Sequence, residues 1–183
     1  ALYPARFDAV QKFHAPGLAP ARDRSGAFHI TDRGEIAYAG RFHHTWGFYD
    51  LLAAAQDADG WLHIRPDGAA LYAARFAWVG NFQESRCAVR ESAGAYYHIT
   101  DQGTPAYRDR HRYVGDFRDG IAVARFTSDD LCGHINPDGR AVHPVRFLEL
   151  DVLHKGIARA RDERGWFHVD VSGRALYSNR FLA

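Results

Sequence analysis

The sequence lacks several features that define common classes of protein. It has no methionine and only two cysteines in 183 residues, which excludes a disulfide scaffold of the kind found in small secreted domains. Lys and Arg together number 23 against 22 Asp and Glu, and this balance disfavours a dedicated nucleic-acid or membrane-surface module. No apolar run approaches the ~20 residues of a membrane span. We therefore expect neither nucleic acid nor membrane as a partner. Without a methionine at position 1, we also expect the sequence to be part of a longer protein.

Short catalytic motifs are absent as well. The sequence contains no Gly-x-Ser-x-Gly elbow, Walker loop, Gly-x-Gly-x-x-Gly, His-Glu-x-x-His or Cys-x-x-Cys, which are the local signals of hydrolases, nucleotide-binding proteins and zinc or redox sites. Carboxylates such as Glu84, Asp129 and Asp130 do not recur in pairs that would suit acid–base chemistry. We therefore predict that this chain is not an enzyme and has no cofactor.

A tandem repeat dominates what is present. A ring-bearing residue, two variable residues, an arginine and a second ring-bearing residue form a pentad that recurs six times, always 34–36 residues apart. Between pentads come a stretch of small apolar residues, a histidine followed by Ile or Val, and a glycine five residues after that histidine. Such a period is the signature of a repeat architecture. The pentad arginines are Arg6, Arg41, Arg75, Arg110, Arg146 and Arg180.

The periodicity within a unit is that of β-strands. In Trp166–Asp170, alternate residues are apolar, as expected of a strand with two unlike faces. The tetrads that follow the histidines, such as Asn136–Gly139, are typical of turns in which glycine takes positive φ. We predict three short strands in each unit: the Ala-rich segment, the histidine segment and the pentad.

The predicted fold is therefore all-β, with tandem three-stranded hairpin repeats of 34–36 residues in a single repeat domain over residues 1–183. Because the pentad occurs six times and the other segments five times, we favour an open twisted array. A five-bladed small β-propeller is the alternative. The predicted units are 3–37, 38–71, 72–106, 107–142, 143–176 and a partial 177–183.

Small side chains recur at two positions of the Ala-rich segment. Small residues on one face let neighbouring sheets approach closely, and a single hairpin unit cannot bury its own apolar face. We therefore predict that the units stabilise one another through these positions. The two rows are Ala19, Ala53, Cys87, Ala122 and Ala158, and Ala21, Ala55, Val89, Ala124 and Ala160.

The units resemble the WG-type β-repeats of bacterial proteins. The matching segments are Gly165–Gly173, followed by the pentad that begins at Tyr177, and Phe117–Ala124 or Leu153–Ala160. The strand has Trp166-Phe167 in place of the family's Trp-Gly, and histidine stands where the family has an aromatic residue. The resemblance covers nearly the whole chain and implies a non-catalytic binding or scaffolding array within a longer protein. It implies no particular ligand.

One histidine occupies the same position in each unit. Five imidazoles at equivalent positions suggest either a ligand-facing surface or residues of the repeat core that donate a hydrogen bond to a neighbouring turn, and we favour the core role. A metal site is a weaker alternative, because the histidines lack supporting cysteine or carboxylate ligands at regular spacing. The five are His29, His63, His98, His134 and His168, and the metal alternative uses His63, His98 and His168.

The pentad arginines also allow two interpretations. Aligned guanidinium groups would suit a carboxylate or phosphate ligand. Alternatively, each arginine pairs with an acidic turn of the next unit, which explains why every unit carries one and why the net charge stays near zero. We favour this second interpretation, with acidic partners at Asp32, Asp67, Asp101 and Asp138.

Aromatic residues precede three of the repeat histidines by two positions, at Trp61, Tyr96 and Trp166. They share the histidine face, and aromatic rings beside Arg and His suit sugars, bases or peptide side chains. Inter-repeat packing is the other possible role of these rings, and it is the one that we favour. The predicted function is a non-catalytic module that binds a protein or peptide, or another domain of the same chain, with a small-molecule or metal receptor on the His and aromatic face as the alternative.

Overall fold

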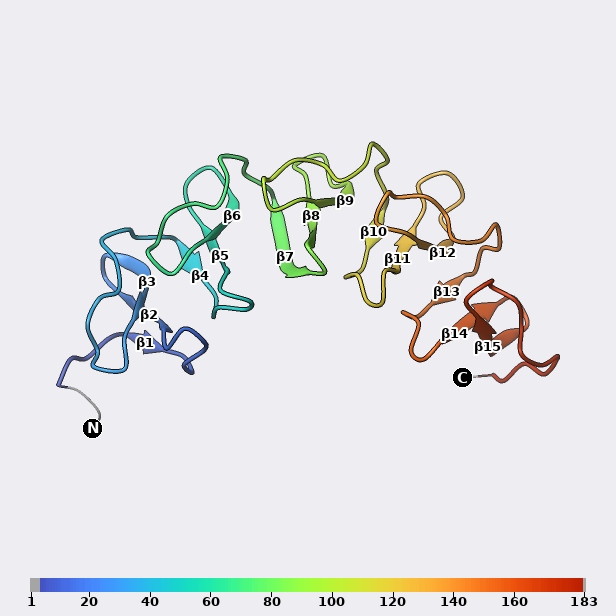
Figure 1. Ribbon diagram of the computed structural model, residues 1–183, viewed down its shortest axis with the longest axis horizontal. Helices are drawn as coiled ribbons and strands as arrows, with labels where there is room; N and C mark the ends of the chain where they lie inside the picture. Colours follow the sequence, from blue (N-terminus) through green and yellow to red (C-terminus); the bar gives the residue numbers. More distant parts are fainter. Residues whose placement is uncertain (1–3, 183) are drawn as a thin grey trace. The chain divides into compact units, whose positions relative to one another are not determined.

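The computed structural model describes residues 4–182, which form fifteen β-strands and no helix. None of these residues, accordingly, belongs to a helix long and apolar enough to cross a membrane. The strands are labelled along the chain in Figure 1. Their bounds are β1 Ala9–Val10, β2 Ala19–Asp23, β3 Gly26–Ile30, β4 His44–Thr45, β5 Ala53–Gln56, β6 Trp61–Ile64, β7 Trp78–Gln83, β8 Arg86–Arg90, β9 Tyr96–Ile99, β10 Tyr113–Val114, β11 Ala122–Arg125, β12 Cys132–Ile135, β13 Glu149–Leu150, β14 Ile157–Asp162 and β15 Gly165–Asp170.

The strands form five three-stranded antiparallel sheets in chain order: β1-β2-β3, β4-β5-β6, β7-β8-β9, β10-β11-β12 and β13-β14-β15. This confirms the predicted all-β fold of tandem three-stranded repeats. The described chain divides into two compact units, each larger than one repeat; they are called the first unit and the second unit below. The first comprises residues 4–82 with 101–104, and the second comprises residues 83–100 with 105–182.

The identity of the third strand differs from the prediction. The pentad is not a strand, and only its last residue pairs with the histidine strand before it, as Phe76 does with Trp61. The third strand is instead the short segment after the pentad, such as His44–Thr45, which pairs with the Ala-rich strand β5. Four of the five such strands have only two residues, too few to show alternation, and this hid them in the sequence. Tyr3, which opens the first pentad, lies outside the described residues.

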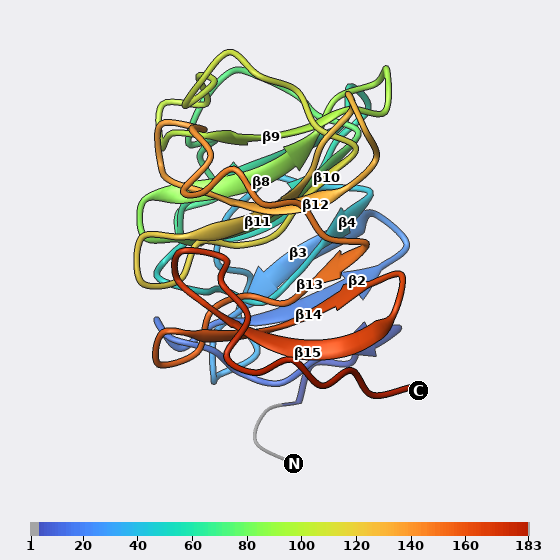
Figure 2. The same ribbon diagram turned by 90° about the vertical axis from the view of Figure 1, so that its right-hand side faces the viewer.

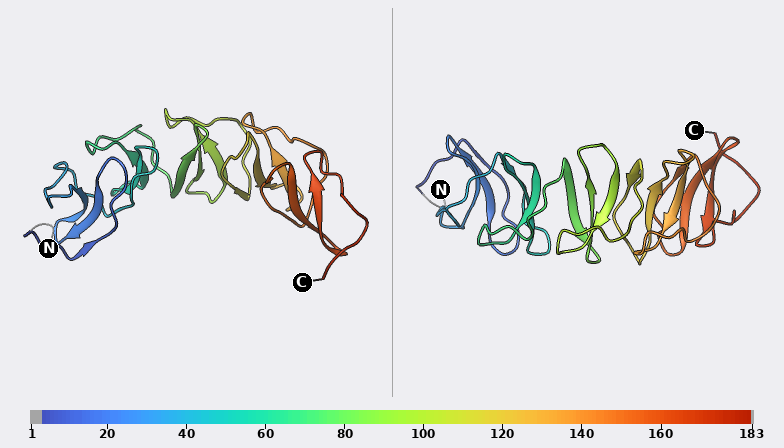
Figure 3. Two further views of the ribbon diagram at one scale, coloured as in Figure 1. Left: turned by 60° about the horizontal axis from the view of Figure 1, so that its bottom comes forward. Right: turned by 90° about the horizontal axis from the view of Figure 1, so that it is seen from above.

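The two rows of small residues lie in the core, as predicted. In the second sheet, Ala53 and Ala55 pair with Ile64 and Leu62, and all four side chains are buried. The same positions are buried in the other sheets. In the second unit the last two sheets lie side by side in the views of Figures 1 and 2, and β12 contacts β13. Ala158 and Ala160 of β14 belong to the same buried cluster as Val123 of β11. Small side chains therefore pack where these two sheets meet, and Figure 3 shows the sheets side by side from two further directions.

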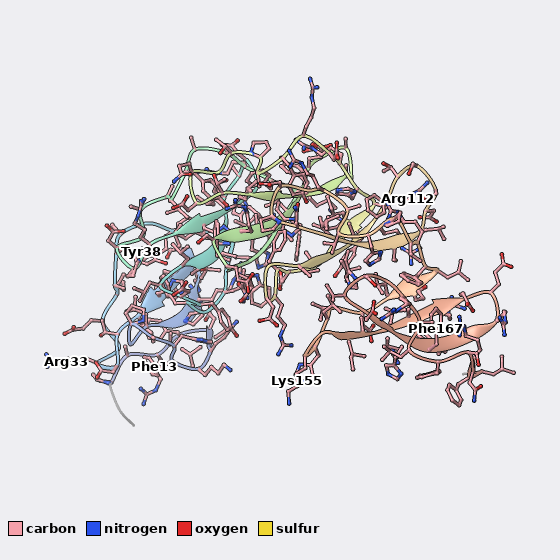
Figure 4. All side chains as sticks on the ribbon, turned by 45° about the vertical axis from the view of Figure 1, so that its right-hand side comes forward. Phe13, Arg33, Tyr38, Arg112, Lys155 and Phe167 are labelled. Atoms are coloured by element: carbon pink, nitrogen blue, oxygen red, sulfur yellow. The ribbon has the colours of Figure 1, made fainter. Side chains whose placement is uncertain are left out.

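Turn glycines are required for two reasons. Gly68, in the turn after β6, has a φ of +80°, a conformation that side-chain-bearing residues rarely adopt. A Cβ on Gly68 would also lie 2.5 Å from the ring of Tyr38, the first residue of the preceding pentad, which is labelled in Figure 4. Gly103, Gly139 and Gly173 take the same conformation, which confirms the predicted positive φ.

Candidate functional site

The five repeat histidines form an internal hydrogen-bond system. His63 on β6 is representative: its Nδ1 lies 2.6 Å from the hydroxyl of Tyr72, nine residues later. Its Nε2 lies 2.9 Å from the carbonyl oxygen of Gly80, seventeen residues later. His29 and His98 make the same pair of contacts with their own tyrosines and carbonyls. Each of these three imidazoles thus joins its own sheet to the next one, in or directly after the first strand of that sheet.

These contacts fix the protonation of the ring. A carbonyl oxygen can only accept, so Nε2 carries the proton and donates it, and Nδ1 accepts from the tyrosine hydroxyl. The next sheet also covers the ring, since the phenyl ring of Phe82 lies 4.9 Å from the His63 imidazole, centroid to centroid. Burial lowers the pKa of His29, His63 and His98 to about 4. The three imidazoles are therefore neutral at physiological pH.

The other two repeat histidines vary this pattern. His134 has His143 in place of a tyrosine, with 3.1 Å between His134 Nδ1 and His143 Nε2, and it contacts the carbonyl of Asp151 through its own Nε2. His168 contacts the hydroxyl of Tyr177 but is exposed. Within residues 4–182, no acceptor lies at its Nε2. Four of the five candidate histidines, namely His29, His63, His98 and His134, are therefore buried and hydrogen-bonded within the fold, in keeping with the core role favoured from the sequence.

A metal site on these histidines finds no support in the geometry. The described residues contain no group of three or more His, Cys, Asp or Glu side chains placed to hold a metal ion. His63 uses both ring nitrogens in hydrogen bonds, and His98 does the same. A nitrogen engaged in this way would have to give up its partner to bind a metal.

The pentad arginines brace the fold. Arg180 is representative: its Nε donates to the Asp162 carboxylate over 2.8 Å, and its guanidinium carbon lies 3.5 Å from the centre of the Phe167 ring on β15. Phe167 is labelled in Figure 4. The guanidinium also donates to pentad carbonyls. Arg75 and Arg110 repeat this arrangement with Asp57 and Glu91.

The predicted acidic partners of these arginines were wrong. Asp32, Asp67, Asp101 and Asp138 lie in the turn after the histidine strand, whereas the carboxylates used lie in the hairpin turn before it. The pairing of the last pentad residue with the start of the histidine strand is the reason, because it brings each arginine beside the hairpin turn of its own sheet. Arg41 reaches the Ser25 hydroxyl at that turn, and Arg146 lies over the Phe126 ring.

The predicted aromatic row is dispersed over three sheets. Trp61 belongs to the first unit, where its ring stacks with those of His44 and Trp46 at centroid distances of 6.4 and 6.5 Å. Tyr96, in the second unit, contacts Tyr113 at 5.8 Å. Trp166 is covered by the guanidinium of Arg159 at 4.3 Å. All three rings are partly buried, and each contacts a side chain of its own sheet or of the next one.

An aromatic groove in the first unit was not anticipated from the sequence. It is a cavity of about 330 Å³ beside the first strands β4 and β7, and we call it the aromatic groove. Its exposed rings are Trp46, Tyr49 and Trp78. The remaining walls are formed by Gln11, Lys12, His14, Gly47, Ala54, Val79, Gly80 and Asn81.

Gly47 is needed for the shape of this groove. A Cβ at Gly47 would lie 2.3 Å from Nε2 of His14, so any other residue would displace the imidazole. The His14 ring in turn lies 5.2 Å from that of Tyr49. The Trp46-Gly47 pair does not stand at the position of the Trp-Gly dipeptide of the WG-type repeats. Its glycine instead leaves room for the His14 ring beside the Tyr49 ring.

A second groove lies in the second unit, beside β10 and β13. It has a volume of about 620 Å³. Its lining combines apolar residues such as Leu150 with Tyr113, Arg118 and three carboxylates, those of Glu84, Asp116 and Asp151. We call it the acidic groove. Both grooves have volumes within the range of about 300–1,000 Å³ that is usual for ligand sites.

Comparisons with known proteins show the fold alone. No protein-family model and no curated protein matches the sequence. Among solved structures, the chain is similar to the computationally designed Ika8 protein, with 14% identity, a TM-score of 0.57, and coverage of 96% of this chain and 63% of that one. It is also similar to the Hsv2 protein of Kluyveromyces lactis with loop 6CD replaced by a Gly-Ser linker, with 9% identity, a TM-score of 0.55, and coverage of 89% and 64%.

The WD40 β-propeller domain of Doa1 is a weaker match, with 14% identity, a TM-score of 0.44, and coverage of 98% of this chain and 71% of that one. The chain spans slightly less than two thirds of the length of the Ika8 and Hsv2 structures. The fold and grooves define the class: an all-β protein of tandem three-stranded sheets that carries open grooves beside its first strands.

Proposed function

We propose that this chain is a non-catalytic binding module whose partner is a protein or peptide, or another domain of the same chain. The observation that carries this proposal is the aromatic groove. Trp46, Tyr49 and Trp78 are 54%, 48% and 40% exposed and line one cavity. Large exposed rings gathered at one place are the usual anchors of protein interfaces, because each buries much area at little cost in side-chain entropy.

The polar residues of the groove suit a peptide. Gln11 and Asn81 contribute amide groups to the lining of the groove, and Lys12 contributes a single positive charge. Amides can donate hydrogen bonds to a peptide backbone and accept them from it. These bonds are directional and would orient a peptide, whereas the apolar contacts of the rings would not. The sheets supply a fixed frame for these side chains, as repeat arrays do for extended partners.

The resemblance to WG-type β-repeats supports the same role. We propose that the repeats are a divergent branch of that type, in which histidine and tyrosine couple successive sheets. A scaffolding or binding array within a longer protein accords with this proposal.

Selection of peptides from a displayed library against residues 1–183 tests the function. Peptides that survive selection are synthesised and titrated by calorimetry. We expect the combined W46S, Y49S and W78S variant to weaken binding at least tenfold. A matched control replaces Val171 and Leu176 with serine, since both are comparably exposed in the second unit.

Two results would contradict the proposal. The first is a completed selection that enriches no peptide. The second is equal affinity of the enriched peptides for the groove variant and the parent. The combined W61S, Y96S and W166S variant separates the groove from the row predicted from the sequence. Loss of binding in that variant alone would place the partner on the dispersed row.

A further inference from the structure

The acidic groove of the second unit contains one carboxylate that the fold does not use. Three carboxylates line the cavity, those of Glu84, Asp116 and Asp151. Two of them are engaged within the unit, and the third is not. Arg118 also lines the cavity. Because Arg159 balances the charge of Asp151, the three carboxylates and the Arg118 guanidinium leave an excess of one negative charge.

Glu84 holds the loop between β10 and β11. One carboxylate oxygen accepts the backbone N–H of Asp119 over 2.7 Å, and the other accepts that of Gly120 over 2.9 Å. Asp119 has a φ of +52° and Gly120 a φ of +73°, so this tight turn is fixed by two charge-assisted hydrogen bonds. Glu84 is therefore a positioning residue that orders the loop in which Asp116 and Arg118 lie.

Asp151 is engaged as well. Its carboxylate accepts from Nε of Arg159 over 2.9 Å, and the Arg159 guanidinium lies over the Trp166 ring. Its backbone carbonyl accepts from Nε2 of His134. Asp151 thus contributes to the wall of the groove while its charge is balanced by a neighbour.

Asp116 differs from both. Within residues 4–182 it makes no hydrogen bond and no ion pair. Although the residue as a whole is exposed, partial burial of its carboxylate raises its pKa. A cation from outside would supply the charged partner that the fold does not give this carboxylate.

The remaining walls suit a long aliphatic stem that carries such a cation. Leu150 and Val152 form an apolar side, and Tyr113, half exposed, offers its ring. Lysine and arginine side chains bury their methylene groups along apolar surface and keep the charge at the tip. A cation near a tyrosine ring gains a further attraction to its face.

We propose that the acidic groove binds a lysine or arginine side chain of a peptide partner, with Asp116 and Tyr113 as the residues that determine specificity. The inference rests on the proposed function in one respect, since it takes the partner to be a peptide. It adds a second contact site, in a different unit from the aromatic groove and with a different preference.

The test uses three capped pentapeptides with residues 1–183, observed by ¹⁵N–¹H correlation spectra at low ionic strength. The sequences are Ala-Lys-Ala-Lys-Ala, the same with arginine in place of lysine, and the same with norleucine, which keeps the stem and removes the charge. We expect both basic peptides to shift the amide signals of Tyr113, Gly115 and Leu150. The norleucine peptide should bind at least about fivefold more weakly.

Variants locate the site. Asp116→Asn should weaken the binding of the basic peptides about fivefold or more, whereas Asp138→Asn, which removes one charge from an exposed turn of the same unit, should not. Tyr113→Ser should weaken binding two- to fivefold. Retained binding in the Asp116→Asn variant, or equal binding of the norleucine peptide, would overturn the proposal.

The outcome is separable from that of the proposed function. If library peptides bind the aromatic groove and the basic peptides do not bind, the binding module stands and the assignment of the acidic groove falls. If the basic peptides bind and no library peptide requires Trp46, the acidic groove stands and the aromatic groove falls.

Discussion

The Nε2–H of His63 donates to the carbonyl oxygen of Gly80 over 2.9 Å, and this bond links the second sheet to the strand β7. The acceptor is a backbone atom, so it is present whatever residue stands at that position. The equivalent acceptors are the carbonyls of Trp46, Gly115 and Asp151. A single side-chain type thus couples sheets whose facing residues differ.

Loss of one such imidazole should therefore be costly. We expect His63→Ala to lower the free energy of unfolding by about 2–4 kcal/mol, because it leaves the partly buried carbonyl of Gly80 without its donor and opens a cavity. His168→Ala removes the same residue from an exposed position and should cost less than about 1 kcal/mol. Denaturant titration of both variants measures the difference. Equal losses would show that the inter-sheet bond contributes little.

Stability should fall as the pH is lowered from about 6.5 to about 4. The pKa of His29, His63 and His98 is about 4 in the folded chain and 6.5 for an ordinary histidine. Between these values the unfolded chain binds protons that the folded chain does not. The stabilising contribution is thus present above pH 6.5 and is lost as the pH falls through this window, by roughly 3 kcal/mol for each histidine.

Denaturant titrations at several pH values between 7 and 4.5 measure this loss. The His63→Ala variant is the control, because it has one fewer group that gains a proton on unfolding. Its stability should depend less steeply on pH than that of the parent. Constant stability of the parent between pH 7 and pH 5 would contradict neutral buried histidines.

Alanine at Gly139 tests the contact between a turn and the preceding pentad. Gly139 has a φ of +76°, and a Cβ there would lie 2.5 Å from the ring of Tyr107. Gly156 has a φ of +79° and nothing within 4 Å of a Cβ. We expect Gly156→Ala to cost about 1 kcal/mol from backbone strain alone, and Gly139→Ala at least about 3 kcal/mol from strain and overpacking together. The difference in unfolding free energy isolates the contact with the ring, and it should vanish if that ring moves aside freely.

Replacement of His143 by tyrosine should stabilise the protein. Nδ1 of His143 is buried without a hydrogen-bond partner, whereas the other described repeats have a tyrosine at the position of His143. A tyrosine hydroxyl would donate to Nδ1 of His134 and leave no polar atom unsatisfied. We expect a gain of about 1 kcal/mol. His143→Phe, which fills the same space without a hydroxyl, should gain less, and thermal or denaturant unfolding of both variants decides the matter.

Much of the fold follows from the sequence because it recurs. The positive φ of the turn glycines and the burial of Ala53 and its equivalents are repeated five times, so each copy supports the assignment of the others. The first strands could not be found in this way. Four of the five, β1, β4, β10 and β13, have two residues each, and two residues cannot establish an alternating pattern.

Contacts between segments distant in sequence were predicted less well. The carboxylate partner of Arg75 lies 18 residues before it, and that of Arg110 lies 19 before it. A signal for this pairing exists in the sequence, since each hairpin turn of the type at Asp57–Gly60 carries an acidic residue at nearly constant distance from the next pentad arginine. The choice between the turn before the histidine strand and the turn after it depends on how the pentad pairs. The sequence analysis took the whole pentad as a strand and therefore chose the wrong turn.

The groove residues escaped the sequence analysis for the opposite reason. Trp46 stands at a position where the other repeats have Gln11, Gly80, Gly115 and Asp151. A search for recurring residues passes over such a position, because nothing recurs there. The scaffold lies in what the units share, whereas the candidate binding residues lie in what distinguishes them.

The constant spacing of the histidine contacts determines where the chain can change in length. The hydroxyl or imidazole partner always comes nine residues after the histidine and the carbonyl always seventeen after it. From that carbonyl to the next histidine the distance varies: 17 residues from Trp46 to His63, 18 from Gly80 to His98 and 19 from Gly115 to His134. Foreign loops therefore have natural points of entry at the tips of the hairpins, such as residues 127–130. The segments between a histidine and its carbonyl have a fixed length, so an insertion within them should disrupt the contact between two sheets.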